Sequence, residues 1–384
     1  MTNKPSLNHM LQQLIATPSM SSVSPEYDVS NRPVIDLLAS WMEDFGFEVE
    51  VIPLRAQPHK ANLLARLGKA NEHSEGLMFA GHTDTVPYDA HLWNFDPFKL
   101  TEADGRYYGL GTSDMKAWFA IVLDALRDVD PTQLKQPIYI LATADEESSM
   151  DGAKELVERG CPNVKYAVIG EPTGLTPVHA HKGIIMESIR LTGRSGHSSD
   201  PSLGNNAMEH MHKVIGDILL WRTELQSKYK DDQFAVPVPT LNLGHIHGGD
   251  NPNRICGECE LHIDLRPLPG MELQELREEL RLRLHNTLNN DIQWSLTSLI
   301  DGTSPMHTPK QSPLVQEAEK LCHRQSHAVA FCTEGPYLNH LGMDTIILGP
   351  GDIDQAHQPD EYLALARISP MQQVIRDLCK RFCF

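Results

Sequence analysis

Four segments of the chain carry acidic or histidine side chains directly after an apolar or glycine-rich run. Carboxylates and imidazoles are ligands of zinc and related metals in enzymes, and a catalytic metal keeps one position open for water. In open α/β sheets, ligands bind at the carboxyl ends of the strands. The segments therefore predict a metal site at one sheet edge, built from His82, Asp84, Asp114, Glu146, Glu147 and Glu171.

The spacing within these segments suggests separate tasks for the side chains. His82 and Asp84 are two residues apart, so an extended chain places them on the same side, where Asp84 can hold the second nitrogen of a ligating histidine. Asp114 lies where a glycine-rich loop enters a predicted helix, and its two oxygens can bridge two metals. Glu146 and Glu147 are adjacent and point in different directions, so one can bind metal while the other accepts a proton from water.

A fifth segment, Ala356–Tyr362, contributes His357 beside another glycine-rich run. Each segment alone is weak evidence, because strand ends often carry a capping carboxylate and a single histidine is commonly structural. Three further pairs share HxH or HxD spacing without a following acidic pair. We interpret them as structural or rim residues in or beside strands of an inserted domain: His179 and His181, His245 and His247, and His262 and Asp264.

The elements that must position the five segments alternate between helix and strand. Apolar periodicity predicts helices at 8–15, 34–45, 114–129 and 152–159. Short apolar or alternating runs predict strands at 48–54, 62–67, 76–81, 137–143 and 165–170. This rhythm is typical of an α/β fold with a mostly parallel sheet and helices on both faces.

The pattern changes after residue 182. Strands are predicted at 184–192, 240–246, 259–266 and 292–299, with helices at 205–227 and 272–288, which together indicate an α+β sandwich. Alternation resumes later, with helices at 314–323 and 368–382 and strands at 328–332 and 344–348. We therefore predict a catalytic domain from residues 1–181 and 298–384, and an inserted domain from residues 182–297.

Composition narrows the class of protein. The chain has 384 residues and a net charge of −18, which disfavours nucleic acid and anionic membranes as partners. No apolar stretch approaches a membrane helix, and the first residues lack an apolar signal core. Seven cysteines make a disulfide framework unlikely, so we expect a cytoplasmic protein. Cys256 and Cys259 form a CxxC beside a predicted strand, which we interpret as structural.

In their order along the chain, GHTDTVP, GTSDMK, ADEES, GEPT and QAHQPDEY resemble the di-zinc deacylase and exopeptidase family from Leu77 to Tyr362. The resemblance implies two zinc ions per subunit, with cobalt as a substitute. It assigns His82 and Glu171 to one metal, Glu147 and His357 to the other, and Asp114 to both. It also assigns Glu146 as the general base, Asp84 as the partner of His82, and a cis peptide to Asp114–Met115.

The same resemblance gives the inserted domain the role of a lid and dimerisation domain in a homodimer. His197, in Gly196–Pro201, would donate a hydrogen bond to the oxyanion across the dimer. Arg254, with Asn253 beside it, would bind a substrate carboxylate through bidentate hydrogen bonds. A surface salt bridge is the alternative for Arg254.

The expected substrate is an N-acyl amino acid. Several segments, including Phe331–Pro336, favour family members that remove an acetyl group from an amino acid with a cationic side chain. Glu334 could then meet the substrate amine, although a loop-stabilising role is equally compatible with the sequence. Succinylated diaminopimelate and dipeptides are the alternative substrates. A non-catalytic zinc-binding protein is disfavoured because Glu146 and all five metal positions are intact.

Overall fold

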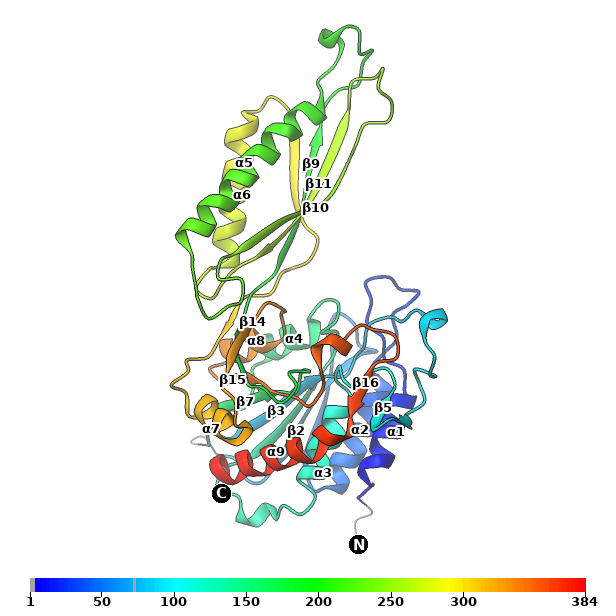
Figure 1. The fold of residues 1–384 in the computed structure, drawn as a ribbon, viewed down its shortest axis with the longest axis vertical. Coiled ribbons are helices and arrows are strands. Elements are labelled where there is room, and N and C mark those ends of the chain that lie inside the picture. Colours follow the sequence, from blue (N-terminus) through cyan, green and yellow to red (C-terminus); the bar gives the residue numbers. More distant parts are fainter. Residues whose placement is uncertain (1–3, 72–73) are drawn as a thin grey trace. The chain divides into compact units, whose positions relative to one another are not determined.

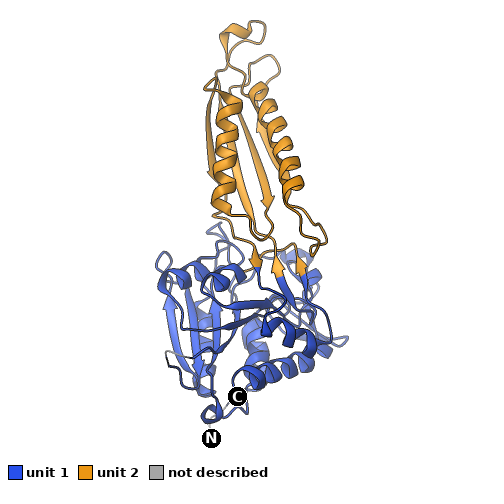
Figure 2. Cartoon of the chain, turned by 90° about the vertical axis from the view of Figure 1, so that its left-hand side faces the viewer, with its two compact units in different colours: residues 1–179, 307–327, 334–384 blue, residues 180–306, 328–333 orange. Residues whose placement is uncertain are grey.

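The structure is a computed structural model that describes residues 4–71 and 74–384 (Figure 1). The chain divides into two compact units (Figure 2). The first unit contains residues 1–179, 307–327 and 334–384, and the second contains residues 180–306 and 328–333. The second unit is larger than the predicted inserted domain of residues 182–297, and it includes residues 328–333 from the later part of the chain.

A nine-stranded sheet runs through the first unit. Its hydrogen-bonded order is β1 (Glu48–Pro53), β2 (Ala61–Leu67), β6 (Ile138–Thr143), β3 (Leu77–His82), β7 (Tyr166–Ile169), β15 (Asp344–Ile347), β8 (Val178–His181) and β13 (Met306–His307), with β14 (His327–Val329) beside β8. The central strands β6, β3, β7 and β15 are parallel, whereas β1, β2 and β8 pair in antiparallel fashion. The parallel strands therefore end at a common edge.

Helices cover this sheet because its central strands have no polar face. Every residue of β3, β6 and β7 is buried, which requires cover on both sides. Residues of α1 (Leu7–Ala16), α2 (Arg32–Asp44), α3 (Ala117–Ala125), α7 (Pro313–Cys322) and α9 (Ile368–Phe382) share one apolar core with the sheet. The helices α4 (Asp151–Arg159) and α8 (Gly335–His340) contact each other.

A small antiparallel sheet stands next to the loop that carries Asp114. It consists of β4 (Thr101–Ala103), β5 (Arg106–Tyr108) and β16 (Tyr362–Ala364), with β5 in the middle. Tyr362 pairs with Tyr108. The segments on either side of this pair, which contain His357 and Asp114, are thereby brought together although they are far apart in sequence.

The second unit is an antiparallel sheet with two helices on one face (Figures 1 and 2). The strand order is β10 (Thr240–Gly248), β11 (Glu258–Arg266), β9 (Ile185–Thr192) and β12 (Gln293–Ser298), and the helices are α5 (Ala207–Lys228) and α6 (Leu273–Leu288). Cys259, Leu261, Ile263 and Leu265 of β11 are buried in a separate apolar core, while the residues between them are not buried. This alternation is expected where one sheet face is covered.

The structure confirms the predicted fold class but corrects several local predictions. The helix predicted to start at residue 114 begins at Ala117, because Ser113 and Asp114 give their backbone N–H groups to a distant carboxylate. The strand β8 was not predicted. It places His179 and His181, both buried, in the nine-stranded sheet rather than among the strands of the α+β sandwich.

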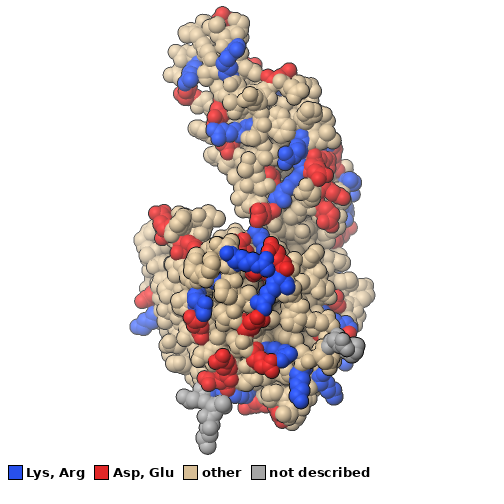
Figure 3. Space-filling model, turned by 180° about the vertical axis from the view of Figure 1, so that it is seen from behind, with Lys and Arg blue, Asp and Glu red and all other residues tan. Residues whose placement is uncertain are grey.

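Acidic and basic side chains intermingle on the face of the molecule drawn in Figure 3. None of the seven cysteines, all of which lie in the described part of the chain, forms a disulfide, and Cys256 and Cys259 lie in the apolar core of the second unit. Within residues 4–71 and 74–384, no helix is both long and apolar enough to cross a membrane.

Candidate metal centre

Three parallel strands deliver the predicted metal-binding groups to one place. In the register of β3 and β6, His82 lies opposite Thr143, so Glu146 follows three residues beyond that pair. In the register of β3 and β7, Ala80 lies opposite Ile169, and Glu171 follows two residues later. The strand ends thus meet at the edge where the sequence predicted them.

Asp114 stands between the two histidines. Its Oδ1 is 3.1 Å from His82 Nε2, and its Oδ2 is 3.7 Å from His357 Nε2. His82 Nε2 is also 3.5 Å from Glu171 Oε1, and His357 Nε2 is 3.0 Å from Glu147 Oε2. Asp114 is therefore placed near both histidines, with Glu171 beside His82 and Glu147 beside His357.

The donor atoms are close enough to hold metal ions. Two groups have ligand atoms within 4.8 Å of one another: His82, Glu146 and Glu171, and His82, Asp114 and Glu147. Burial and the charge of nearby carboxylates raise the pKa of Glu146 and Glu171 well above the usual range. A cation at this position would favour the ionised carboxylates, so the donor set fits a metal centre. His357 is in neither group. Glu146 is in the first group, so distance alone does not distinguish it from the predicted metal ligands.

The orientation of His82 differs from the prediction. Its Nδ1 lies 3.0 Å from the backbone carbonyl oxygen of Asp84 and 3.7 Å from the Asp84 carboxylate. The carboxylate instead accepts hydrogen bonds from the backbone N–H groups of Glu146 and Glu147, at 3.3 and 3.1 Å. Asp84 therefore keeps His82 Nε2 directed toward Asp114 and Glu171, and it also ties the end of β3 to the turn that carries the two glutamates.

Glu361 is a site residue that the sequence analysis missed. Its buried carboxylate accepts hydrogen bonds from the backbone N–H groups of Gly111, Ser113 and Asp114, at 2.9, 2.6 and 2.9 Å. The only sequence signal was an acidic residue in the His357 segment. Glu361 positions the loop that carries Asp114, and the peptide bond after Asp114 is cis, as predicted.

A buried ion pair positions the residue before Glu146. Lys60 Nζ lies 2.6 Å from Asp145 Oδ1 and 2.7 Å from Asp28 Oδ1, and the Lys60 and Asp145 side chains are each only 2% exposed. Asp145 has a φ of 60°, and its carbonyl oxygen accepts a hydrogen bond of 2.7 Å from the backbone of Met150. This network holds the turn from which Glu146 projects.

We expect Lys60→Met to destabilise the protein by about 3–5 kcal/mol, because it leaves buried carboxylates without their cation. Urea unfolding measures the loss. Lys380→Met is the matched control, since Lys380 is 67% exposed in its pair with Asp377 and exposed pairs contribute about 0–1 kcal/mol. Equal losses for the two variants would contradict a structural role of the buried pair.

Comparison with known proteins decides the family. The model for peptidase family M20/M25/M40 matches residues 78–381. The chain belongs to this family. It is also 48% identical, over 99% of its length and 98% of the other protein, to a Pasteurella multocida (strain Pm70) protein named acetylornithine deacetylase.

Solved structures of M20 proteins have the same fold at low sequence identity. The metallo-carboxypeptidase Sso-CP2 of Sulfolobus solfataricus aligns over 98% of this chain and 99% of its own, with a TM-score of 0.76 and 17% identity. The Bacillus subtilis YXEP protein, described as a dinuclear metal binding peptidase from the M20 family, aligns over 97% of this chain and 98% of its own. Its TM-score is 0.66 and its identity 13%. Both likenesses concern the fold alone.

In this M20 chain, the site residues predicted for the inserted domain lie together in the second unit. His197 and Arg254 form an isolated antiparallel bridge, and the backbone N–H of Ser198 donates to the Asn253 carbonyl oxygen at 3.0 Å. Arg254 is 53% exposed and forms an ion pair with Asp250. The ion pair agrees with the salt-bridge alternative for Arg254, while the exposure leaves the guanidinium accessible to a ligand.

Glu334 belongs to the first unit and is buried. Its Oε2 accepts a hydrogen bond of 2.7 Å from Thr143 Oγ1, at the end of β6. Its Oε1 has no hydrogen-bond partner among the described residues. The bond to Thr143 supports the loop-stabilising alternative, because it joins the start of α8 to the strand that leads to Glu146.

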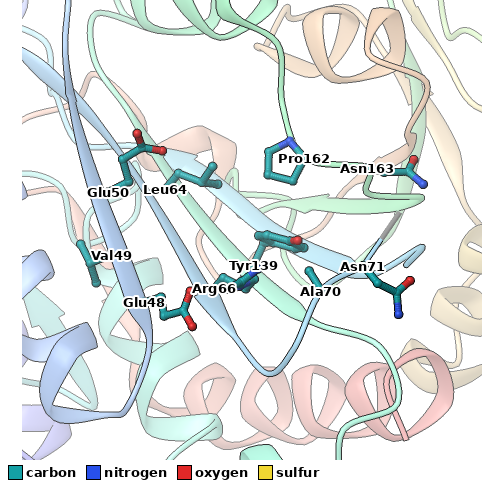
Figure 4. Close-up of a pocket in the computed structure, with 10 residues that line it drawn as sticks. All are labelled: Glu48, Val49, Glu50, Leu64, Arg66, Ala70, Asn71, Tyr139, Pro162 and Asn163. Carbon is teal, nitrogen blue, oxygen red and sulfur yellow. Dashed lines mark hydrogen bonds and ion pairs between the residues drawn. The ribbon is translucent and has the colours of Figure 1, made fainter. Parts of the chain in front are cut away.

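A separate surface cavity of about 520 Å³ lies beside β1, β2 and β6 (Figure 4). Its lining includes Glu48, Glu50, Arg66 and Tyr139, and Arg66 forms an ion pair with Glu48. None of the predicted site residues lines it. The cavity is therefore not the predicted catalytic site.

Proposed function

We propose that this chain hydrolyses the amide bond of N2-acetyl-L-ornithine, releasing L-ornithine and acetate, as a step in arginine biosynthesis. The observation that carries the proposal is the convergence of His82, Glu171, Glu147 and His357 around Asp114. The substrate follows from the relative named acetylornithine deacetylase, which aligns over 99% of the chain.

In this proposal His82 and Glu171 would hold one zinc ion, Glu147 and His357 would hold a second, and Asp114 would serve both, with cobalt as a functional substitute. When bound, the two ions lower the pKa of a water molecule and polarise the amide carbonyl. The hydrogen bond from His82 Nδ1 to the Asp84 carbonyl supports this assignment, since a ligating histidine commonly donates its other N–H to such an acceptor.

Glu146 is the proposed general base. It accepts the proton of the attacking water and returns it to the departing amine of ornithine. Burial and nearby carboxylates raise the pKa of Glu146 well above the usual range in the metal-free chain, and bound cations would favour the ionised form that a base requires. Asp84 and Lys60 act indirectly, because they fix the turn that carries Glu146.

The second unit supplies the remaining groups in the proposal. His197 donates a hydrogen bond to the oxyanion, while Arg254 and Asn253 bind the substrate carboxylate. Glu334 contacts no substrate group in this scheme, and it stabilises the end of β6 through its hydrogen bond with Thr143. The second unit also acts as lid and dimerisation domain of a homodimer.

We further propose a cytoplasmic enzyme that binds neither nucleic acid nor membranes. The net charge of −18 and the mixed charges in Figure 3 support this, because nucleic acids and anionic membranes both bind preferentially to basic protein surfaces. Seven cysteines without a disulfide agree with a reducing compartment.

A comparison of substrates tests the proposal. With zinc or cobalt present, kcat/KM for acetylornithine should exceed the values for succinyl-diaminopimelate and dipeptides by at least about 10-fold. Exhaustive chelation should remove the activity, and added metal should restore it. Faster hydrolysis of succinyl-diaminopimelate or a dipeptide would identify that compound as the better substrate. Full activity without metal would contradict the proposed mechanism.

A further inference from the structure

The open face of the second unit carries three histidines that the proposed mechanism does not use. His245 and His247 are two residues apart on β10, and His262 is on the neighbouring antiparallel strand β11. His245 lies directly opposite His262, and His247 lies opposite Glu260. Four side chains of metal-ligand type thus occupy adjacent positions of one strand pair.

Alternation along the strands places all four on the same face. On β11, Leu261 is buried with its core, whereas Glu260 and His262 on either side are partly exposed. The register shifts between Leu243 and His245 and is regular beyond it. Because residues two apart share a face, His245 and His247 project beside Glu260 and His262. The rings of His245 and His262 are 4.8 Å apart.

Glu260 holds His262 in an orientation that suits metal binding. Its Oε1 accepts a hydrogen bond of 2.6 Å from Ser188 Oγ and lies 2.9 Å from His262 Nε2. The hydrogen bonds from Ser188 and His262 lower the pKa of Glu260, so it remains ionised at neutral pH. With Nε2–H donated to a carboxylate, the Nδ1 of His262 carries the free lone pair, which is the arrangement that orients histidine ligands in metal sites.

The neighbouring charged groups leave this position available. Arg190, opposite Glu260 on β9, forms an ion pair with Glu258, and Asp264 pairs with Arg266 at 2.8 Å. The nearest cation is therefore engaged by its own partner. Imidazoles at these accessible positions are suitable ligands for a divalent transition metal.

We propose that His245, His247 and His262 form a third metal site, separate from the catalytic centre, that binds Zn²⁺ or a similar divalent transition metal. Three imidazoles leave the fourth position of a tetrahedral ion to water. Within the described residues, the groups whose ligand atoms already converge lie in the first unit. Binding therefore requires the exposed side chains of His245 and His247 to rotate toward His262, which strand neighbours on one face can do.

Counting bound metal at controlled free concentration tests the proposal. The full-length protein is stripped with a chelator and then equilibrated by dialysis against increasing free Zn²⁺, and zinc per chain is measured by mass spectrometry. The double variant His245→Ala/His262→Ala should bind one zinc ion fewer at saturation than the parent, with unchanged amide hydrolysis. His285→Ala, which removes an exposed histidine of α6, should match the parent.

Glu260→Gln supplies a second measurement that keeps all three ligands. Losing the carboxylate that orients His262 should raise the free Zn²⁺ at half-saturation of the third site by about 10–100-fold. Equal zinc content in the parent and the folded double variant would overturn the proposal, as would an unchanged half-saturation in Glu260→Gln. Because the result is a difference between variants, it does not depend on how many metals the first unit binds.

Discussion

Replacing Glu146 by glutamine should lower kcat by roughly 10²- to 10⁴-fold while the metal content stays unchanged, because the substitution removes a proton acceptor and keeps the size of the side chain. Distance alone does not settle this role, since Glu146 belongs to a group of ligand atoms within 4.8 Å with His82 and Glu171. The variant therefore separates the two functions that a carboxylate at this position can have. Steady-state kinetics and metal analysis of the same preparation measure both.

Glu147→Gln is the matched comparison, because it changes the neighbouring residue in the same way. Glu147 Oε2 lies 3.0 Å from His357 Nε2, in the set assigned to the second metal. This variant should lose metal together with activity, and high metal concentrations should restore part of the activity. If Glu146→Gln and Glu147→Gln lost metal equally, the division of the pair into base and ligand would be wrong.

His197→Ala should lower kcat by about 10²–10³-fold, the usual cost of removing one oxyanion donor. The structure supports a donor role, because the backbone N–H of Ser199 donates to His197 Nδ1 at 3.2 Å and Ser199 Oγ is 2.7 Å from the same nitrogen. With Nδ1 accepting, the proton of the neutral ring is on Nε2 and can be donated. Metal content should not change, and KM should change little, since the contact forms in the transition state.

The control for this variant is His212→Ala, which removes an exposed histidine of α5 and should leave kcat unchanged. A large rise in KM with an unchanged kcat would assign His197 to substrate binding instead. Loss of metal in His197→Ala would contradict the role of His197 as a hydrogen-bond donor to the oxyanion.

Mixing two inactive proteins tests whether His197 acts across a homodimer. Random exchange of equal amounts of His197→Ala and Glu146→Gln makes half of the dimers mixed, and one site in each then has both groups intact. The mixture should therefore recover about one quarter of wild-type activity. Activity no higher than that of the parents, with subunit exchange proven by labelled chains, would reject delivery across the dimer.

Local sequence patterns predicted most of the elements because their periodicity is strong. The terminal helix Ile368–Phe382 has the predicted bounds, and the strands β3, β6 and β7 are mostly apolar and buried along their whole length. Short elements were harder. The strand β8 has four residues of which two are histidines, unlike the apolar four-residue strand β7, and β16 has only three residues, so neither forms a clear apolar run.

The sequence by itself determined the ligand types and their order, because carboxylates and imidazoles after apolar strands have few other uses in combination. His82, Asp114, Glu147, Glu171 and His357 were all predicted from such segments, and the structure brings them to one sheet edge. Membership of the M20/M25/M40 family agrees with that order. Residue types and the rule that parallel strands end together predicted where these groups would meet, whereas the resemblance to the family supplied the role of each group.

Only the tertiary structure decided which groups hold these residues in place. Lys60 meets Asp145 from 85 positions away, and Glu361 meets the Asp114 backbone from 247 positions away. The carboxylate of Asp84 accepts a hydrogen bond from the backbone of Glu147, whereas His82 is hydrogen-bonded to the backbone carbonyl of Asp84. Such contacts form between residues that are far apart in sequence and become neighbours only when strand ends and loops pack together. The spacing of residues within one segment therefore could not predict them.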